Sequence, residues 1–391
     1  MEGKPKILIV DDEPLNLDYL EQELEDRPVE IITAANGQSA LEAVAAQLPE
    51  MIFLDIMMPV MDGFEVLRRL KANLQWKDIP VVIISAATDM ASVVKGIELG
   101  AEDFLPKPFN PVILHARLNS GLEKKRLRDI EKSYLRSLER ELEIGREIQA
   151  GFLPKTIPQP SGWEIEACFH PAREVAGDFY DVFELDDAHL VLLLGDVTDK
   201  GVGAALFMSL YSSLLRVLIT MDLPAYSVAA FSPLSPETRI RQAVNQVNHY
   251  ITSVHESSML ATLFVGVLDH TSGELCYINA GHDHPYLLRS GSIHAQLTPT
   301  SPLVGAIEDL DYTARGITLQ PGDRLVIYSD GITDALDPEG QMYSKERWQD
   351  LLCQPVLLDN LHAEYLAEKV LEFAAGAPQY DDISLLVLTR K

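Results

Sequence analysis

Residues 6–121 alternate short apolar runs with longer amphipathic segments, and no other feature constrains the fold as strongly. Runs such as 7–10 and 51–54 have the length of strands, and the segments between them have the length of helices. Because these runs are apolar at every position, helices should cover both faces of the sheet that they form. The pattern predicts an α/β domain over residues 1–121, with a doubly wound parallel sheet of five strands.

Polar, reactive residues follow four of these apolar runs. Asp11 and Asp12 come after the first run, Asp55 after 51–54, Ser85 after 81–84, and Lys107 after the last. In an open parallel sheet, ligands bind beyond the carboxyl ends of the strands, so these side chains should lie together. Clustered carboxylates repel one another unless a cation lies among them, and oxygen ligands favour Mg²⁺. A carboxylate can also attack phosphorus to form an acyl phosphate.

The motifs DDEP, DIMMPVMDG, IISA and LPKPF in this region resemble those of the response-regulator receiver family. The resemblance implies that a sensor histidine kinase or phosphotransfer protein supplies a phosphoryl group to Asp55. It implies contacts from Ser85 and Lys107 to that group, an aromatic switch at Phe104, and a cis peptide between Lys107 and Pro108. It also implies a magnesium ion held by Asp11, Asp12, Asp55 and the main-chain carbonyl of Met57.

Residues 122–153 contain no proline and are dense in Glu, Lys, Arg and Leu, which predicts one long helix. An apolar stripe runs along it, formed by Leu127, Ile130, Tyr134, Leu138 and Leu142. The stripe favours a coiled-coil linker and a parallel homodimer. The alternative is a helix that packs on its own chain.

After the prolines at 154, 158 and 160, residues 154–391 change to strands and turns. Strands are expected at 164–169, 178–184, 189–195, 259–268, 274–279, 285–289, 324–329 and 383–389. Helices are expected at 203–221 and 237–253, and a loop at 222–236. Grouped helices with mostly antiparallel strands predict an α+β sandwich.

Acidic residues border several strands of this region. Asp178, Asp196 and Asp330 do so, and no basic residue lies near Asp330 in the sequence. Gly331 should let the main chain come close to a ligand. Convergent carboxylates favour Mg²⁺ or Mn²⁺ over zinc, and two such ions can activate water and clamp a phosphoryl group.

The segments AGDFYD, GDVTDKGVGAAL, NAGHDHP, PGDRLVIYSDGITDA and YDDIS resemble metal-dependent (PPM-type) serine/threonine phosphatases of the sporulation and general-stress branch. The resemblance implies two Mn²⁺ or Mg²⁺ ions, with ligands Asp178, Asp196, Asp330 and Asp381, a further carbonyl from Val197, and Asp382 as the alternative last acid. The chain departs from the family at Asp199, where GHG or GKG is usual. For His282 and His284 a polar turn between strands is the favoured interpretation, with metal ligation as the alternative.

The overall charge and the cysteine pattern exclude several functions. With 59 acidic and 32 basic residues the formal charge is −27, which disfavours a nucleic-acid partner. Three separated cysteines without CxxC spacing fit reduced thiols in a cytosol. We expect no apolar run to approach the roughly 18 residues of a membrane span, and therefore a cytoplasmic protein without membrane partners.

Two classes of function fit these sites. The first is a phosphorylation-controlled phosphatase that acts on a phosphoserine or phosphothreonine regulatory protein, an anti-sigma-factor antagonist by family resemblance. The second is a non-catalytic adaptor that binds a sigma factor or its regulator for turnover. An adaptor would be expected to have lost its metal-binding acids, and all of them are present, which favours catalysis.

Overall fold

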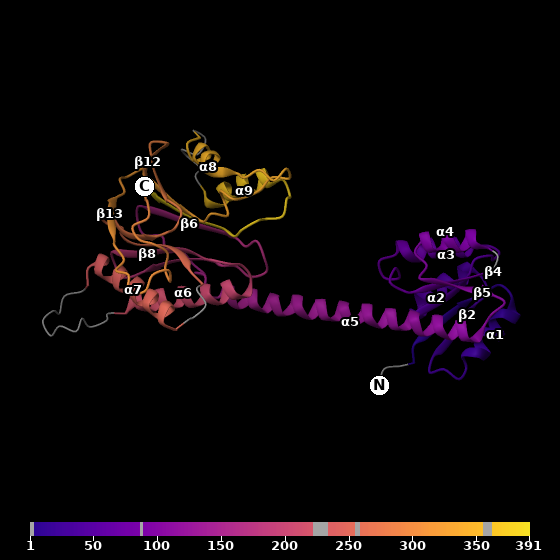
Figure 1. Ribbon diagram of the computed structural model, residues 1–391. Coiled ribbons are helices and arrows are strands. Elements are labelled where there is room, and N and C mark those ends of the chain that lie inside the picture. Colours follow the sequence, from indigo (N-terminus) through magenta and orange to yellow (C-terminus); the bar gives the residue numbers. More distant parts are fainter. Residues whose placement is uncertain (1–3, 87–88, 222–233, 255–258, 355–361) are drawn as a thin grey trace. The chain divides into compact units, whose positions relative to one another are not determined.

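The computed structural model describes residues 4–86, 89–221, 234–254, 259–354 and 362–391. The chain divides into two compact units, Met1–Glu139 and Arg140–Lys391 (Figure 1). Most of the expected loop at 222–236 lies outside the described residues. The two units are described separately below.

The first unit is a parallel sheet of five strands in the order β2-β1-β3-β4-β5. The strands are β1 (Lys6–Val10), β2 (Glu30–Ala34), β3 (Met51–Asp55), β4 (Val81–Ala86) and β5 (Asp103–Lys107). The helices are α1 (Pro14–Leu24), α2 (Gly37–Gln47), α3 (Gly63–Ala72), α4 (Met90–Glu98) and the start of α5 (Pro111–Ala150). The predicted doubly wound α/β fold is therefore confirmed.

The alternating side chains of β1 show why helices cover both faces of this sheet. Leu8 and Val10 belong to a core shared with α2 and α3, whereas Ile7 and Ile9 belong to a core shared with α1 and α5. All four side chains are fully buried. Two layers of helices are needed because successive strand residues point to opposite faces.

Helix α5 is one continuous helix of 40 residues. The helix expected to follow β5 is continuous with the predicted linker, so the long helix begins at Pro111 and not at residue 122. Four residues of the predicted stripe are exposed, namely Leu127, Ile130, Tyr134 and Leu138, and Leu142 is half-buried. The long helix is confirmed, while the coiled coil and the domain boundaries at 121 and 153 remain predictions.

Within the described residues, the second unit contains two antiparallel sheets of five strands each. One sheet has the order β13-β10-β9-β8-β7, made of β7 (Asp178–Glu184), β8 (His189–Val197), β9 (Ala261–Asp269), β10 (Glu274–Ala280) and β13 (Arg315–Thr318). The other has the order β12-β11-β14-β15-β6, made of β6 (Trp163–His170), β11 (Tyr286–Arg289), β12 (Ser292–Gln296), β14 (Arg324–Tyr328) and β15 (Ile383–Arg390).

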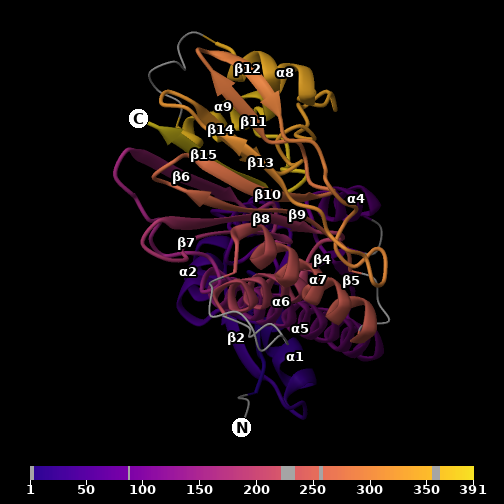
Figure 2. The same cartoon turned by 90° about the vertical axis from the view of Figure 1, so that its left-hand side faces the viewer.

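The second unit is built in four layers, with a helix pair outside each sheet (Figure 2). Helices α6 (Val202–Thr220) and α7 (Pro236–Val254) cover the first sheet, and α8 (Ser344–Leu352) and α9 (Ala363–Ala374) cover the second. Along β8, Leu192 and Leu194 point to the opposite sheet, whereas Val191 and Leu193 point to α6 and α7. This is the predicted α+β sandwich.

The sequence prediction missed β12, β13, α8 and α9. Strands β12 and β13 are sheet edges of five and four residues, and their side chains are mostly exposed or half-buried. Edge strands need no continuous apolar face, so they give little hydrophobic signal. Helices α8 and α9 are short amphipathic segments of nine and twelve residues.

Helix α6 corrects the expectation that no apolar run reaches the length of a membrane span. It has 19 residues and a mean hydropathy of 1.8, which is long and apolar enough to cross a membrane by length and composition. One of its faces is nevertheless buried in the core beside α7, through Ala204, Met208, Tyr211, Leu215 and Ile219. Core helices of globular domains meet the same test, so α6 is weak evidence for a membrane span.

Candidate functional site

The first candidate site lies at the carboxyl ends of the strands in the first unit. The ligand atoms of Asp11, Asp12 and Asp55 all lie within 4.8 Å of one another. Lys107 extends from the end of β5, and its Nζ lies 2.8 Å from Asp11 Oδ2 and 3.0 Å from Asp55 Oδ2. The structure thus brings together three acids and a cation from strands that are separate in the sequence.

Asp55 is buried, and its surroundings act on its charge in opposite directions. Burial raises the pKa of the Asp55 carboxyl, Lys107 lowers it, and Asp11 raises it. The main-chain N–H of Ile56 donates to Asp55 Oδ1 at 2.8 Å. A side chain on Gly63 would overlap the carbonyl oxygen of Asp55, so the tight turn after β3 requires glycine here.

The other predicted receiver residues differ in burial. Ser85 is buried at the end of β4, and Phe104 is half-buried against the core shared with α2 and α3. The side chain of Met57 is exposed, which leaves its main chain as the group for the predicted role. The Lys107–Pro108 peptide is cis, as expected.

The second candidate site lies at one end of the sandwich, where both sheets contribute acids. Strands β7 and β8 are antiparallel, and their register pairs Asp178 with Asp196. In the other sheet, Asp330 follows the end of β14, and Asp381 and Asp382 precede its antiparallel neighbour β15. The sequence therefore placed these five acids correctly at strand ends.

Burial and mutual repulsion shift the titration of these acids. Burial, then the charges of Asp196 and Asp382, raise the pKa of Asp178 well above its usual range. Burial, then Asp330 and Asp381, raise the pKa of Asp196 to about 8. Burial, then Asp381, raise the pKa of Asp330 to about 6. A divalent cation would remove the repulsion, and oxygen ligands alone suit Mg²⁺ or Mn²⁺.

The spacing of the acids differs between the two sites. In the described part of the chain, no three of the acids in the second unit have all their ligand atoms within 4.8 Å, unlike Asp11, Asp12 and Asp55. Two ions about 3.5–4 Å apart draw their ligands from a wider space than one ion does. The acids of the second unit are thus not gathered as tightly as Asp11, Asp12 and Asp55.

Asp381 and Asp382 are neighbours with different surroundings. Asp382 Oδ1 accepts the N–H of Ala172 at 2.7 Å, and its Oδ2 accepts the N–H of Gly177 at 2.9 Å. Asp381 Oδ2 instead lies 2.7 Å from the Nζ of Lys200. Asp382 thus holds the loop that leads to Asp178, while the carboxylate of Asp381 already faces a cation. The geometry favours Asp381 as the ligand.

Lys200 is a functional candidate that the sequence interpretation missed. Its charge opposes the rise in the pKa of Asp330, although no basic residue lies near that acid in the sequence. Lys200 Nζ also donates to the Tyr380 carbonyl at 2.6 Å and lies 4.1 Å from the centre of the Tyr380 ring. Lys200 belongs to the motif TDKG, which the sequence analysis examined only for Asp199. The fold brings this loop to residues 380–381.

The departure at Asp199 is explained by the main chain. Asp199 has φ +80°, in the left-handed region that favours glycine and that Asp tolerates. Its side chain is exposed, and Asp199 Oδ1 accepts the N–H of Lys200 at 2.8 Å. The additional carboxylate is therefore bonded within its own loop.

Gly331 allows a close contact between two segments of the main chain. A side chain there would overlap the carbonyl oxygen of Asp382. The glycine lets the chain after β14 pack directly on the start of β15. It therefore helps to hold Asp330 and Asp382 in the same end of the sandwich.

A cavity of about 250 Å³ opens beside Asp196 and Asp330. Its other lining residues include His282, Asp283, His284 and Lys345. His282 lies in the turn between β10 and β11, is buried, and places its Nδ1 2.7 Å from Thr262 Oγ1. Burial lowers the pKa of His282 to about 4, so the ring is neutral at neutral pH.

The cavity also contains an ion pair that the sequence did not suggest. Lys345 Nζ, from α8, lies 2.7 Å from Asp283 Oδ1. These residues are 62 positions apart, so no local spacing could have paired them. The pair adds a cation to the lining of a cavity that also contains Asp196 and Asp330.

The end of α5 contacts the loop that carries Asp178. Gln149 is buried, its Nε2 donates to the Ala176 carbonyl at 2.7 Å, and its Oε1 accepts the Ala176 N–H at 2.9 Å. Ala176 is two residues before Asp178. The last turn of the long helix is thus bonded to the main chain beside the second site.

Family models match most of the chain. The response regulator receiver domain matches residues 7–119, and the stage II sporulation protein E (SpoIIE) model matches residues 186–391. The second match contains Asp196, Asp330, Asp381 and Asp382 and begins after Asp178.

Individual relatives resemble separate parts of the chain. Protein IcfG of a Synechocystis strain is 38% identical over 262 residues, which are 64% of this chain and 41% of IcfG. Response regulator PleD of Caulobacter vibrioides is 45% identical over 115 residues, which are 29% of this chain and 25% of PleD. The chain therefore spans less than half the length of either relative.

A solved structure supports the fold of the second unit. The SiaA PP2C domain of Pseudomonas aeruginosa has a TM-score of 0.53 and 21% identity, and the match covers 66% of this chain and 99% of that one. At this identity the likeness concerns the fold. The family matches show that the chain belongs to the stage II sporulation protein E (SpoIIE) family and contains a response-regulator receiver domain.

Proposed function

We propose that the phosphatase domain is a metal-dependent enzyme that removes phosphate from phosphoserine or phosphothreonine. The observation that carries this proposal is the group of buried and half-buried acids whose pKa values are raised by burial and then by mutual repulsion. Two Mn²⁺ or Mg²⁺ ions would be held by Asp178, Asp196, Asp330 and Asp381, with the carbonyl of Val197 as a further ligand. Asp382 would position the loop before Asp178.

When bound, such ions supply an activated water and a positive charge opposite the phosphoryl oxygens. The chain's own residues then have separate tasks. The cavity beside Asp196 and Asp330 admits the phosphorylated side chain, and Lys345 offers a cation at its edge. Lys200, which lies on Asp381, would be free to pair with phosphate oxygens once an ion neutralises that acid.

The first unit would control this activity as a receiver. Asp55 would accept a phosphoryl group from a sensor histidine kinase or phosphotransfer protein. Mg²⁺ would be held by Asp11, Asp12, Asp55 and the Met57 carbonyl. Ser85 and Lys107 would contact the phosphoryl oxygens. Phe104 would act as the aromatic switch, changing its position when Asp55 is phosphorylated. Lys107 supports this role because it already lies between Asp11 and Asp55.

Helix α5 would transmit the signal, and its exposed stripe would form a parallel dimer. Leu127, Ile130, Tyr134 and Leu138 expose large apolar side chains along one helix, which is unfavourable in water unless a partner covers them. A second copy of the chain offers the same stripe, as parallel coiled coils require. The contact of Gln149 with Ala176 would carry a shift of this helix to the second site.

The substrate that fits the family resemblance is a phosphorylated anti-sigma-factor antagonist, dephosphorylated in the cytoplasm. The adaptor function remains the second candidate. An adaptor would not need five acids at the price of mutual repulsion, which is why catalysis is favoured.

Hydrolysis of a phosphoserine protein by the full chain tests the proposal. Turnover should require Mn²⁺ or Mg²⁺, should stop in EDTA, and should change when acetyl phosphate is added. A chain that binds its regulatory partner but hydrolyses no phosphoester with any of these ions would support the adaptor instead.

A further inference from the structure

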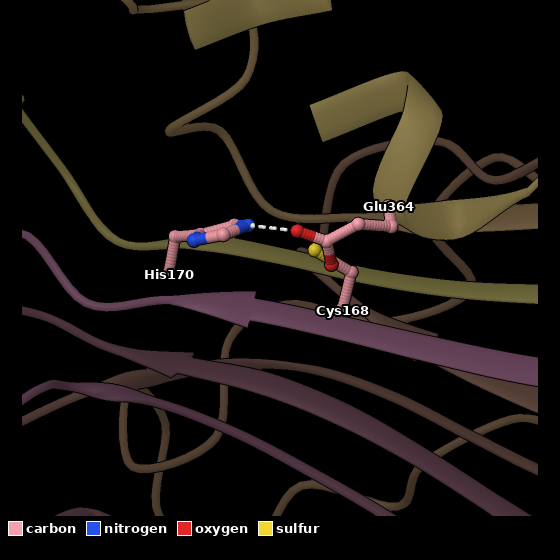
Figure 3. Close-up of side chains that lie close together, drawn as sticks. All are labelled: Cys168, His170 and Glu364. Atoms are coloured by element: carbon pink, nitrogen blue, oxygen red, sulfur yellow. Dashed lines mark hydrogen bonds and ion pairs between the residues drawn. The ribbon is translucent and has the colours of Figure 1, made fainter. Parts of the chain in front are cut away.

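Three side chains of the phosphatase domain that have no part in the sites above meet between β6 and α9. They are Cys168, His170 and Glu364, shown in Figure 3. Their ligand atoms all lie within 4.8 Å of one another, and His170 Nε2 lies 3.1 Å from Glu364 Oε1. No local pattern predicts this group, because His170 and Glu364 are 194 positions apart in the sequence.

The fold holds these three residues in place independently of any ligand. Cys168 and His170 are two positions apart on β6, so they point to the same face of the sheet. Glu364 lies in the first turn of α9. Glu166, on the same face of β6, holds the start of that helix, because its carboxylate accepts the N–H of Ala363 at 2.9 Å and bonds His362.

The chemistry of this group differs from that of the acid clusters. It offers one sulfur, one imidazole nitrogen and one carboxylate oxygen, whereas the other sites offer oxygen alone. Sulfur and nitrogen donors suit Zn²⁺, while Mg²⁺ prefers oxygen. Three protein ligands leave one tetrahedral position for water.

Burial, then the Glu364 carboxylate, raise the pKa of the Cys168 thiol, so the thiol keeps its proton while no cation is present. On binding, the S–H bond breaks, a sulfur–metal bond forms, and the proton passes to solvent. Glu364 and His170 remain partly exposed, which gives an ion a path to the group.

We propose that Cys168, His170 and Glu364 form a binding site for a zinc-class divalent cation that joins β6 to α9. Such an ion would tie together two elements far apart in the sequence and so stabilise the phosphatase domain. Its effect would extend toward the catalytic acids through the main chain. The His170 carbonyl accepts from Gln379 Nε2 at 2.7 Å, and the same nitrogen donates to the Asp381 carbonyl at 2.7 Å.

Cobalt is a suitable probe, because Co²⁺ bound to a thiolate gives a charge-transfer absorption that oxygen-only sites cannot give. The full-length protein, cleared of metal with EDTA and kept reduced, is titrated with Co²⁺ alone and then with Zn²⁺. One equivalent of Co²⁺ should develop the band, and one equivalent of Zn²⁺ should remove it and raise the melting temperature. The Asp330→Asn variant should behave in the same way, which separates this site from the acids.

Matched variants assign the ligands. Cys168→Ser should abolish the band, whereas Cys353→Ser, which changes an exposed free thiol, should keep it. Glu364→Gln changes an exposed side chain and should lower the affinity at least about tenfold with the fold intact.

Absence of the band in the wild type, or its persistence in Cys168→Ser, would overturn the proposal. If Cys168→Ser does not fold, the affinities of Glu364→Gln and His170→Gln for Co²⁺ test the proposal instead. Unchanged affinity in both would reduce the group to a surface hydrogen bond beside a core cysteine.

Discussion

Asp330→Asn should stabilise the metal-free protein and at the same time remove turnover. In the folded chain the pKa of Asp330 is about 6, against an ordinary value of 3.8, because the carboxyl is buried and lies near Asp381. Well below pH 3.8 the group is neutral in both states and costs no stability. As the pH rises from about 4 to 6 the unfolded state loses its proton first, so folding stability falls, and above 6 the whole cost is present.

The size of this effect follows from the two pKa values. The rise from 3.8 to about 6 corresponds to at most about 3 kcal/mol at roughly 1.36 kcal/mol per pKa unit. For a unit of this size, 1 kcal/mol moves the melting temperature by about 2–4 °C. The variant in EDTA at pH 7.5 should therefore melt up to about 6–12 °C above the wild type. At pH 4 the difference should nearly vanish.

Thermal melts with and without Mn²⁺, together with hydrolysis of a phosphoserine protein, measure both effects. Mn²⁺ should raise the melting temperature of the wild type and have a much smaller effect on the variant. Asp350→Asn, which removes one charge from an exposed position on α8, is the control and should change neither result. Full Mn²⁺-dependent turnover in Asp330→Asn would refute the ligand assignment. A lower melting temperature in EDTA would refute the argument from crowded charges.

Three further predictions concern the receiver, the linker helix, and the contact between the end of that helix and the loop before Asp178. Acetyl phosphate with Mg²⁺ should phosphorylate the wild type and should not phosphorylate Asp55→Asn. Lys107→Ala should still bind Mg²⁺ but lose most of the change in turnover that acetyl phosphate causes in the wild type. A normal response of this variant would exclude the proposed role of Lys107. Light scattering should give a dimer at micromolar concentration that Leu138→Glu converts to a monomer, and a wild-type monomer would contradict the coiled coil. Gln149→Ala should fold and bind Mn²⁺ but respond to acetyl phosphate at most weakly in turnover assays, whereas an unchanged response would move the connection elsewhere.

The sequence was sufficient to predict the fold where hydrophobic period and motif agree. The apolar runs of residues 6–121 specify a sheet that is buried on both faces, and β1 shows this in the alternation of Leu8 and Ile9. The acids of both sites could be located because each follows or precedes an apolar strand. Hydrophobic patterns do not identify strands at the edges of a sheet, because such strands need no continuous apolar face. Strands β12 and β13 were missed for this reason.

Contacts between residues that are far apart in the sequence could not be predicted, for a physical reason. Lys200 reaches Asp381, and Lys345 reaches Asp283, only after the sandwich has formed. The same holds for Cys168 and Glu364, which belong to a strand and a helix far apart in the chain. Local periodicity reports which face of an element is buried, but it does not report which distant element lies on that face.

In the proposed mechanism, Gln149 would carry a shift of α5 to the second site without changing any metal ligand. Its side chain makes two hydrogen bonds to Ala176, which Gly177 connects to Asp178, and the N–H of Gly177 donates to Asp382. A rotation of the last turn of α5 must either break the two bonds or carry this loop with it. At about 0.5–1.5 kcal/mol for each bond, the pair is worth about 1–3 kcal/mol. Coupling energies of about 1–3 kcal/mol correspond to roughly 5–150-fold changes in affinity. Loss of these two hydrogen bonds would therefore be large enough to change the affinity of the acids for metal ions by such a factor.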